Sequence, residues 1–105
     1  MPLMLDIHAN GETIGIRRGT TVIVTLASNP STGYSWKLDA GGGRVVRLVS
    51  HRYVPPAKQV PGAGGREVWR FVASTRGATK LALEYLRPWA PKHVVRWFRV
   101  TFRVT

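Results

Sequence analysis

The sequence predicts an all-β protein, an antiparallel β-sandwich of seven to eight strands. Short segments rich in Val, Ile, Thr and aromatic residues recur along the 105 residues, separated by turns that contain Gly or Pro. Several segments alternate apolar and polar residues with period two, as half-buried strands do. No long segment shows a 3.6-residue apolar period, so no helix is predicted. At this length we expect one domain, residues 1–105.

The strand boundaries follow from the turn signals. Asn10-Gly11 is the strongest short hairpin signal, so a strand at its N-terminal side should return directly after it. Gly41-Gly42-Gly43 and the segment 74–78 mark two further turns. The predicted strands are residues 3–8, 13–16, 21–27, 34–38, 44–53, 67–73, 79–86 and 95–104. Alternation places these side chains together on one face of their strands: Val22, Val24, Leu26, Trp36, Leu38, Trp69, Phe71, Leu81, Leu83, Tyr85, Phe98, Val100, Phe102 and Val104.

A stiff, exposed loop is predicted between Asn29 and Tyr34. Asn29 can bond its own backbone, Pro30 fixes φ and lacks an N–H, and Gly33 permits a positive φ. Such a loop loses little conformational entropy on docking, which suits recognition. An ordinary connection between two strands is the alternative.

Two more loops have unusual compositions. Residues 54–65 hold three prolines and three glycines and end in Gly-Ala-Gly-Gly. A dinucleotide-binding motif would need glycine where Glu67 stands and a helix where a strand is predicted, so these glycines indicate backbone freedom or close approach of a partner. In the loop 87–93, Trp89 stands between two prolines and is predicted to be a presented aromatic anchor beside Arg87. The alternative is a Trp packed onto the end of the sandwich.

The chain is strongly basic, with 16 Lys and Arg against 5 Asp and Glu and a net charge of +11. An acidic protein surface or a nucleic acid is the partner class that this charge favours. Trp97, flanked by Arg96 and Arg99, would suit an RNA-binding sheet face. Basic residues that merely cover solvent-exposed faces are the alternative, because they are spread along the whole chain.

The sequence lacks the residue combinations that mark catalytic or metal sites. It has no cysteine, which excludes disulfides, thiolate zinc sites and a cysteine nucleophile. The histidines lack metal-ligand spacing, the acids form no general acid–base pair, and Gly-x-Ser-x-Gly is absent. We therefore expect no enzyme, no metal and no cofactor. The residues considered are His8, His51, His93, Asp6, Glu12, Asp39, Glu67 and Glu84.

No segment has the roughly 20 apolar residues of a membrane span, so no membrane partner is expected. The first residues lack the basic and apolar regions of a signal peptide. The compartment stays open, since a secreted or periplasmic form with its signal removed would have the same sequence.

Three motifs in this order carry a family resemblance: Asn-Pro-Ser-Thr-Gly-Tyr at 29–34, Gly-Ala-Gly-Gly at 62–65 and Arg-Pro-Trp at 87–89. With them the chain resembles the chagasin family of cysteine protease inhibitors. The resemblance implies an immunoglobulin-like sandwich with the three loops clustered at one end. It also implies tight, reversible inhibition of papain-like cysteine peptidases, endogenous or foreign. We expect a monomer.

The resemblance further implies how the cleft of the peptidase is blocked. Loop 29–34 is expected to enter the catalytic centre, while loops 62–65 and 87–91 clamp the cleft from either side. The family commonly has Thr where Ser31 stands, so this chain keeps the hydroxyl and lacks a methyl group. The implied protease-binding residues are Asn29, Pro30, Ser31, Thr32, Gly33, Tyr34, Gly62, Ala63, Gly64, Gly65, Arg87, Pro88 and Trp89. A basic β-domain that binds nucleic acid or another polyanion is the alternative, and a sandwich-type assembly module is a third reading.

Overall fold

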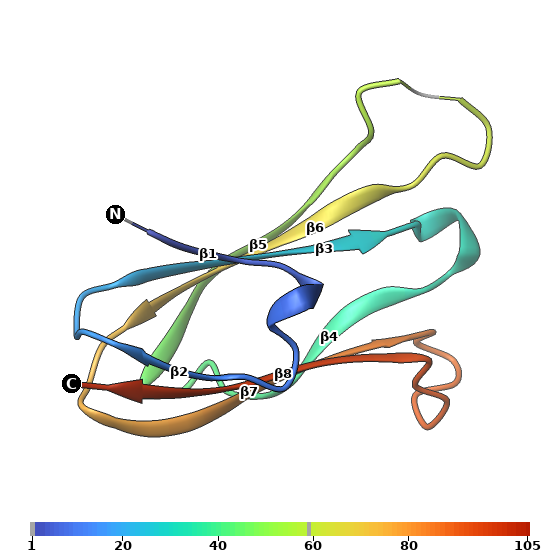
Figure 1. Cartoon of the computed structure of the whole chain (residues 1–105). Coiled ribbons are helices and arrows are strands. Elements are labelled where there is room, and N and C mark those ends of the chain that lie inside the picture. Colours follow the sequence, from blue (N-terminus) through green and yellow to red (C-terminus); the bar gives the residue numbers. More distant parts are fainter. Residues whose placement is uncertain (1, 59) are drawn as a thin grey trace.

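Two four-stranded sheets pack face to face in the computed structural model, which describes residues 2–58 and 60–105 (Figure 1). This confirms the predicted all-β, immunoglobulin-like sandwich. One sheet has the order β1-β3-β6-β5, and we call it sheet A; the other, sheet B, has the order β2-β8-β7-β4. The strands are β1 (Leu3–Leu5), β2 (Thr13–Ile16), β3 (Thr21–Ser28), β4 (Ser35–Ala40), β5 (Val46–Val54), β6 (Gly65–Ala73), β7 (Gly77–Leu86) and β8 (Arg96–Val104).

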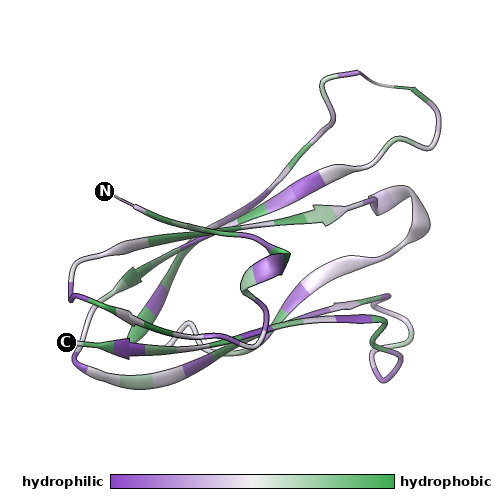
Figure 2. Cartoon of the chain, viewed as in Figure 1, coloured by the Kyte–Doolittle hydropathy of each residue, from purple (hydrophilic) through white to green (hydrophobic). Residues whose placement is uncertain are grey.

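The core lies between the sheets and is built from the faces that alternation predicted. Hydrophobic and hydrophilic residues alternate along β8 (Figure 2), and its inward residues Phe98, Val100, Phe102 and Val104 are buried. Their burial removes apolar surface from water, which is the main driving force for folding. Trp36 and the inward residues of β3, β6 and β7 complete the same cluster. No helix in the described residues is long and apolar enough to span a membrane.

The hairpin predicted at Asn10-Gly11 is wrong. β1 pairs in parallel with β3 of sheet A, whereas β2 pairs in parallel with β8 of sheet B. The chain crosses between the sheets through a short 3-10 turn, η1 (Ile7–Ala9), which Asp6 caps by accepting from the His8 N–H at 2.9 Å. Asn10-Gly11 then binds the backbone of Arg99 instead of closing a hairpin, with Asn10 Oδ1 accepting at 2.7 Å and the Gly11 N–H donating at 2.6 Å.

The other departures concern boundaries and short turns. Four strand pairs are antiparallel, as predicted, and the two pairs that involve β1 and β2 are parallel. A second 3-10 turn, η2 (Pro30–Thr32), follows β3, although no helix of any kind was predicted. β6 begins at Gly65, two residues before its predicted start, so Gly65 belongs to a strand and not to the loop. Met1 lies outside the described residues, and so does residue 59, which belongs to the predicted loop 54–65.

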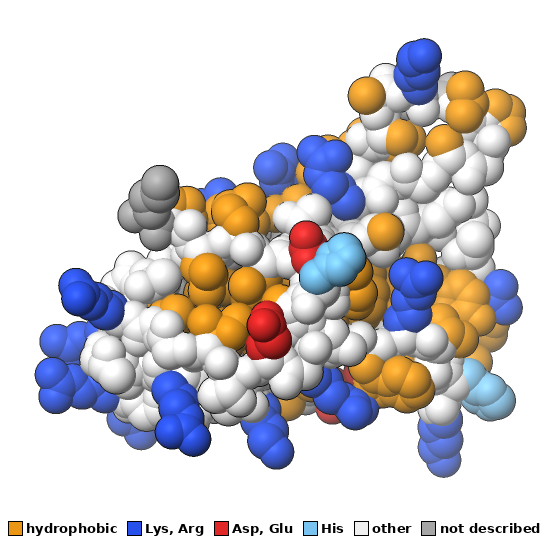
Figure 3. All heavy atoms as spheres, viewed as in Figure 1, with side chains coloured by type: hydrophobic (Ala, Val, Ile, Leu, Met, Phe, Trp, Pro, Cys, Tyr) orange, Lys and Arg blue, Asp and Glu red, His pale blue; other side chains and the backbone are white. Residues whose placement is uncertain are grey.

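The connections that follow β3, β5 and β7 all lie at one end of the sandwich, while both termini lie at the other end (Figure 1). The loops therefore cluster as predicted, at the end of the molecule that is free of the termini. Lys and Arg side chains are spread over the surface rather than gathered at this end (Figure 3).

Candidate functional site

The first loop is held in one conformation by hydrogen bonds within it. The Asn29 side chain caps η2 by accepting from the Ser31 N–H at 3.3 Å, and Pro30 stands at the start of the turn, where its missing N–H costs nothing. The Thr32 and Gly33 N–H groups donate to Asn29 O and Pro30 O at 3.1 and 2.9 Å. Gly33 ends the turn at φ 84°, a left-handed conformation that favours glycine. The stiffness predicted from composition thus has a definite source.

Both hydroxyl groups of this loop bond inside it. Ser31 Oγ donates to Asn29 Oδ1 at 2.7 Å, and Thr32 Oγ1 donates to Asn29 O at 2.7 Å while accepting from the Tyr34 N–H at 3.4 Å. The protons of both hydroxyl groups are therefore used in fixing the loop. Serine performs this role at position 31 without the methyl group of threonine.

The third loop is a tight turn that presents Trp89. The Ala90 N–H donates to Arg87 O at 2.9 Å, with Pro88 at the second position of the turn, which its fixed φ favours. Trp89 exposes 71% of its surface, so it is presented as predicted and not packed into the sandwich. Its ring nevertheless lies against the first loop, because a Cβ placed on Gly33 would overlap the tip of the indole.

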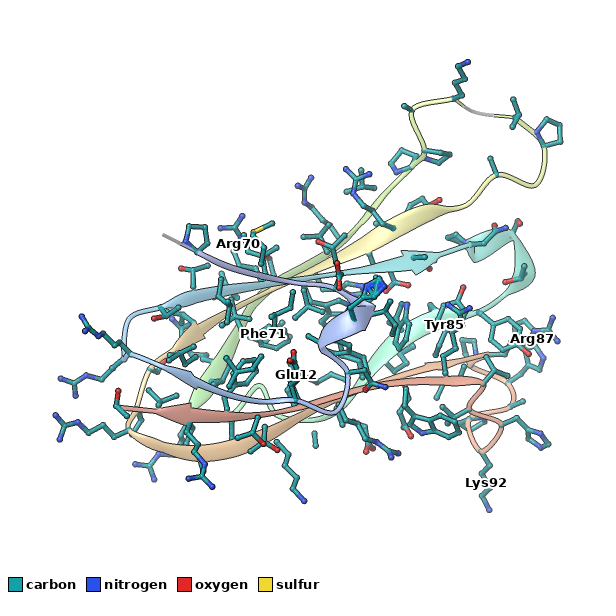
Figure 4. All side chains as sticks on the ribbon, viewed as in Figure 1. Glu12, Arg70, Phe71, Tyr85, Arg87 and Lys92 are labelled. Carbon is teal, nitrogen blue, oxygen red and sulfur yellow. The ribbon has the colours of Figure 1, made fainter. Side chains whose placement is uncertain are left out.

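Arg87 joins the first and third loops. Its Nε donates to Thr32 O at 3.0 Å, and its guanidinium lies 4.4 Å from the centre of the Tyr34 ring and 5.7 Å from that of Trp89. Stacking of a guanidinium on aromatic faces adds to the hydrogen bond. Figure 4 shows Arg87 at the loop end, with Tyr85 behind it toward the core. The side chain is only half exposed, so its main contacts are within the protein.

An aromatic column continues from Arg87 into the core. Tyr34 stacks on Tyr85 with ring centres 5.4 Å apart, and Tyr85 contacts Trp36 at 5.0 Å. Tyr85 Oη also accepts from the Asn29 N–H at 3.0 Å. Sequence reasoning placed Tyr85 on an inward face but missed this link to the first loop. Through these contacts the exposed first loop is packed against buried residues of the core.

The second loop meets the first at its glycines. Asn29 Nδ2 donates to Gly62 O at 3.2 Å, and Gly62 has a φ of 80°. A Cβ on Gly64 would lie only 3.1 Å from Ser28 O, so the absence of a side chain allows the two loops to approach. Gly65 serves the sheet instead, because a Cβ there would overlap Val54 O of the neighbouring strand. The structure thus shows a close approach between two loops of the chain, whereas the sequence predicted backbone freedom or the close approach of a partner.

Glu67 anchors both ends of the first loop, a role that sequence reasoning missed. Only 3% of this residue is exposed. Its Oε2 accepts from Ser28 Oγ at 2.6 Å, at the end of β3 in sheet A, and from the Trp36 N–H at 3.0 Å, near the start of β4 in sheet B. His51 Nε2 lies 2.6 Å from Oε1. The sequence did contain a signal for this role, because strand alternation places Glu67 on the same inward face as Trp69 and Phe71.

An open hollow of about 510 Å³ lies at this end of the molecule, between the first two loops and the adjoining ends of β3, β6, β7 and β8. It is lined in part by Asn29, Thr32, Tyr34 and Gly64, all of them predicted site residues. The structure thus brings the three predicted loops together. Within residues 2–58 and 60–105, no three His, Asp or Glu residues are grouped so that they could hold a metal ion.

Comparison with known proteins gives a consistent family. The family described as Chagasin family peptidase inhibitor I42 matches residues 15–105. Chagasin from Trypanosoma cruzi is 33% identical over 96 residues, which cover 87% of each chain. Amoebiasin-1 from Entamoeba histolytica is 34% identical over 97 residues, covering 90% of this chain and 92% of that protein. The solution structure of amebosin has a TM-score of 0.80 at 31% identity and covers 100% of this chain and 99% of that one.

These relatives extend over nearly the whole chain, and the family is one of inhibitors rather than enzymes. The all-β fold agrees with that of the solved relative. The chain therefore belongs to the chagasin family of peptidase inhibitors.

Proposed function

We propose that this protein inhibits papain-like cysteine peptidases reversibly, by covering the catalytic cleft with loops 29–34, 62–65 and 87–91. The observation that carries the proposal is that contacts within the chain lock these loops together at one end. Asn29 bonds to Gly62, and Arg87 bonds to Thr32. Because this order exists before a partner arrives, little entropy is lost on binding.

Loop 29–34 would occupy the catalytic centre without being cleaved. A papain-like site attacks a peptide carbonyl with a cysteine thiolate paired to an imidazolium. The Asn29, Pro30 and Thr32 carbonyl groups already accept hydrogen bonds, the first two within η2 and the third from Arg87. These hydrogen bonds hold the three carbonyls in the turn, whereas attack by the thiolate requires a close and oriented approach to an extended peptide. The loop therefore blocks the nucleophile but is a poor substrate.

The flanking loops would supply most of the contact energy. Trp89 is a large exposed aromatic side chain on a fixed turn, and Trp and Arg are typical hot-spot residues. Gly62 offers backbone without a side chain and with open space around it, so a cleft wall can approach closely on the other side. Loops on both sides of the central one would contact both walls of the cleft.

Titration against papain with a small fluorogenic substrate tests this proposal. We expect competitive inhibition that is reversed by dilution, and an intact inhibitor chain after incubation. A serine protease such as trypsin should keep its full activity. If papain remains fully active at micromolar inhibitor, or if the chain is cut within residues 29–34, the proposed mode of inhibition is wrong.

A further inference from the structure

Four arginines form a line on the outer face of sheet A, and this line begins at Arg66, next to the second loop, and extends toward the opposite end of the sheet. They come from two adjacent strands, β6 and β5, and all four side chains are exposed: Arg66, Arg70, Arg47 and Arg52. In Figure 4, Arg70 points away from the molecule, while the next residue, Phe71, points into the core. The family match and the proposed inhibition assign no role to this face.

The strand register sets the spacing of the line. Arg52 stands opposite Val68, and Arg47 opposite Val72. The order along the sheet is therefore Arg66, Arg52, Arg70 and Arg47, alternating between the two strands. Each step advances two residues, about 7 Å, so the line is about 20 Å long.

No acid offsets the charge of this line. The ion pairs in the described part of the chain are His8 with Asp6 and His51 with Glu67, so none of its Lys or Arg side chains lies within 4.0 Å of a carboxylate. Glu67 is in the same sheet but faces inward and is buried. On the outer face, the β3 residues opposite Val72 and Val68 are Thr21 and Thr25, which are uncharged. In Figure 3, Lys and Arg side chains stand along the upper margin of the molecule, over β5 and β6.

The line continues into a hollow at the end of the sheet that is remote from the loops. Arg18 and Arg70 line it together with hydroxyl-bearing residues, which can donate to anions. Its lining residues are Pro2, Arg18, Gly19, Thr20, Thr21 and Arg70. Guanidinium groups match the oxygens of sulfate and phosphate groups with two parallel hydrogen bonds. The face is therefore suited to a chain of oxyanions.

The geometry favours a straight, narrow polyanion over a nucleic acid. A duplex turns once in about 10 base pairs, so four successive phosphates on one strand follow an arc of roughly 100° around the duplex axis, whereas the four arginines follow the two strands. Single strands bind to aromatic platforms, but the exposed large aromatics in the described residues, Tyr53, Trp89 and Trp97, are not on this face. An extended polysaccharide needs neither stacking nor a groove, and its sulfates can follow the arginines along the whole line.

We propose that the outer face of sheet A binds a linear sulfated polysaccharide through Arg66, Arg52, Arg70 and Arg47. This function is separate from the inhibition of peptidases, because the arginine line lies on a sheet face and the loops lie at the end. The inhibitor could then be held on a sulfated matrix while its loops remain free to bind a peptidase.

Heparin is the probe for this surface, and two matched triple variants locate the contact. Arg47→Gln, Arg52→Gln and Arg70→Gln remove three charges from the line. Arg76→Gln, Arg99→Gln and Arg103→Gln remove three charges from the turn before β7 and from the outer face of β8. All six side chains are exposed, so both variants should fold, which thermal melting verifies. Both should inhibit papain as the parent does.

Affinity for heparin is measured as a function of salt concentration. We expect the sheet A variant to bind at least about tenfold more weakly at 0.15 M NaCl, and its slope of log K against log salt to fall by about 2, as for three lost contacts at ~0.7 each. The control variant should change less than about threefold. Desulfated heparin and a 20-base-pair duplex should bind the parent more weakly than heparin does.

Three results would overturn the proposal: equal losses in both variants, tighter binding of the duplex than of heparin, or no binding of heparin by the parent. Binding of desulfated heparin as tight as that of heparin would also exclude the sulfates as the recognised groups. Papain inhibition is read separately in each protein. Its failure would refute the proposed function and leave the polysaccharide result standing.

Discussion

Trp89 combines high exposure with a backbone that cannot move far. Its turn is closed by the hydrogen bond between Ala90 and Arg87, and its ring rests against Gly33. Exposed aromatic anchors of this kind carry much of the energy of standard-size interfaces. We predict that Trp89→Ala weakens papain inhibition by about 2 kcal/mol or more, near thirtyfold, with little change in the melting temperature.

Trp97→Ala is the matched control for Trp89. Trp97 is 41% exposed, but it lies on the outer face of β8, where the Arg99 guanidinium lies 5.4 Å from its ring centre. Its loss should leave inhibition unchanged. Trp36→Ala is the opposite case: this residue is fully buried, so the change should cost about 3–5 kcal/mol of stability. If Trp89→Ala melted early while the folded fraction inhibited normally, Trp89 would be a packing residue.

Gly33 is constrained both by its backbone and by its neighbour. With φ at 84°, an added Cβ brings strain of about 1 kcal/mol, and that Cβ would also overlap the Trp89 ring. We predict that Gly33→Ala displaces the first and third loops together and weakens inhibition at least tenfold. Inhibition constants and melting curves are measured on the same preparations.

Gly19→Ala separates the two effects at Gly33. Gly19 has a φ of 94° but open space around it, and it lies in the turn before β3, at the other end of the strand from the first loop. The Gly19→Ala variant should lose about as much stability as the backbone strain costs at Gly33, and it should inhibit papain as the parent does. Equal inhibition by Gly33→Ala and the parent would show that the contact between Gly33 and Trp89 has no part in binding.

At the scale of elements, Glu67 fastens the ends of β3 and β4 to β6. Glu67→Ala leaves the buried Ser28 hydroxyl and the Trp36 N–H without their acceptor, at about 1–3 kcal/mol each. We predict a loss of about 3 kcal/mol or more in the free energy of unfolding. The folded protein should also bind papain more weakly, because the ends of loop 29–34 are no longer joined.

Glu67→Gln tests whether the charge or the hydrogen bonds matter. The amide oxygen can still accept from Ser28 and Trp36, and the amide nitrogen can donate to His51. We expect most of the stability and the inhibition to remain, as measured by denaturant unfolding and papain titration. Parental stability in Glu67→Ala would contradict the role assigned to this carboxylate.

The sequence predicted elements whose signal is local. Trp36, Phe98 and Phe102 were placed correctly because strand alternation alone decides which side chains face the core. The hairpin predicted at Asn10-Gly11 was wrong because the backbone that this turn binds, that of Arg99, is 89 residues away from Asn10 in the sequence. Glu67 could be assigned to an inward face, but its three partners belong to three other strands, and no local pattern reveals them. The candidate site was predictable as motifs and not as a connected network.

At the scale of the molecule, the net charge of +11 should govern how fast a partner is found. Exposed charges attract an oppositely charged surface over about 10 Å at 0.1 M salt and are screened above that concentration. For a peptidase with an acidic surface, we predict that raising NaCl from about 0.05 to 0.5 M slows association about tenfold and leaves dissociation nearly unchanged. Stopped-flow and surface-binding measurements give the two rates. A salt effect mainly on dissociation would indicate charged contacts within the interface instead.

The parallel pairing of β2 with β8 has a consequence for how the chain folds. Residues 13–16 can pair only after residues 101–104 have been made, and only then is sheet B complete. The Thr105 N–H also donates to Ile16 O. Closing so long a loop carries an entropic cost before any contact offsets it, and proteins with such topologies fold in milliseconds to seconds. On the ribosome, β2 would remain without its neighbour until the last strand emerges. The strands that flank loops 29–34 and 62–65 have neighbours made before β8, since β3 pairs with β6 and β4 with β7. The turn of Trp89 joins β7 to β8, so the third loop should be organised only when that last strand pairs.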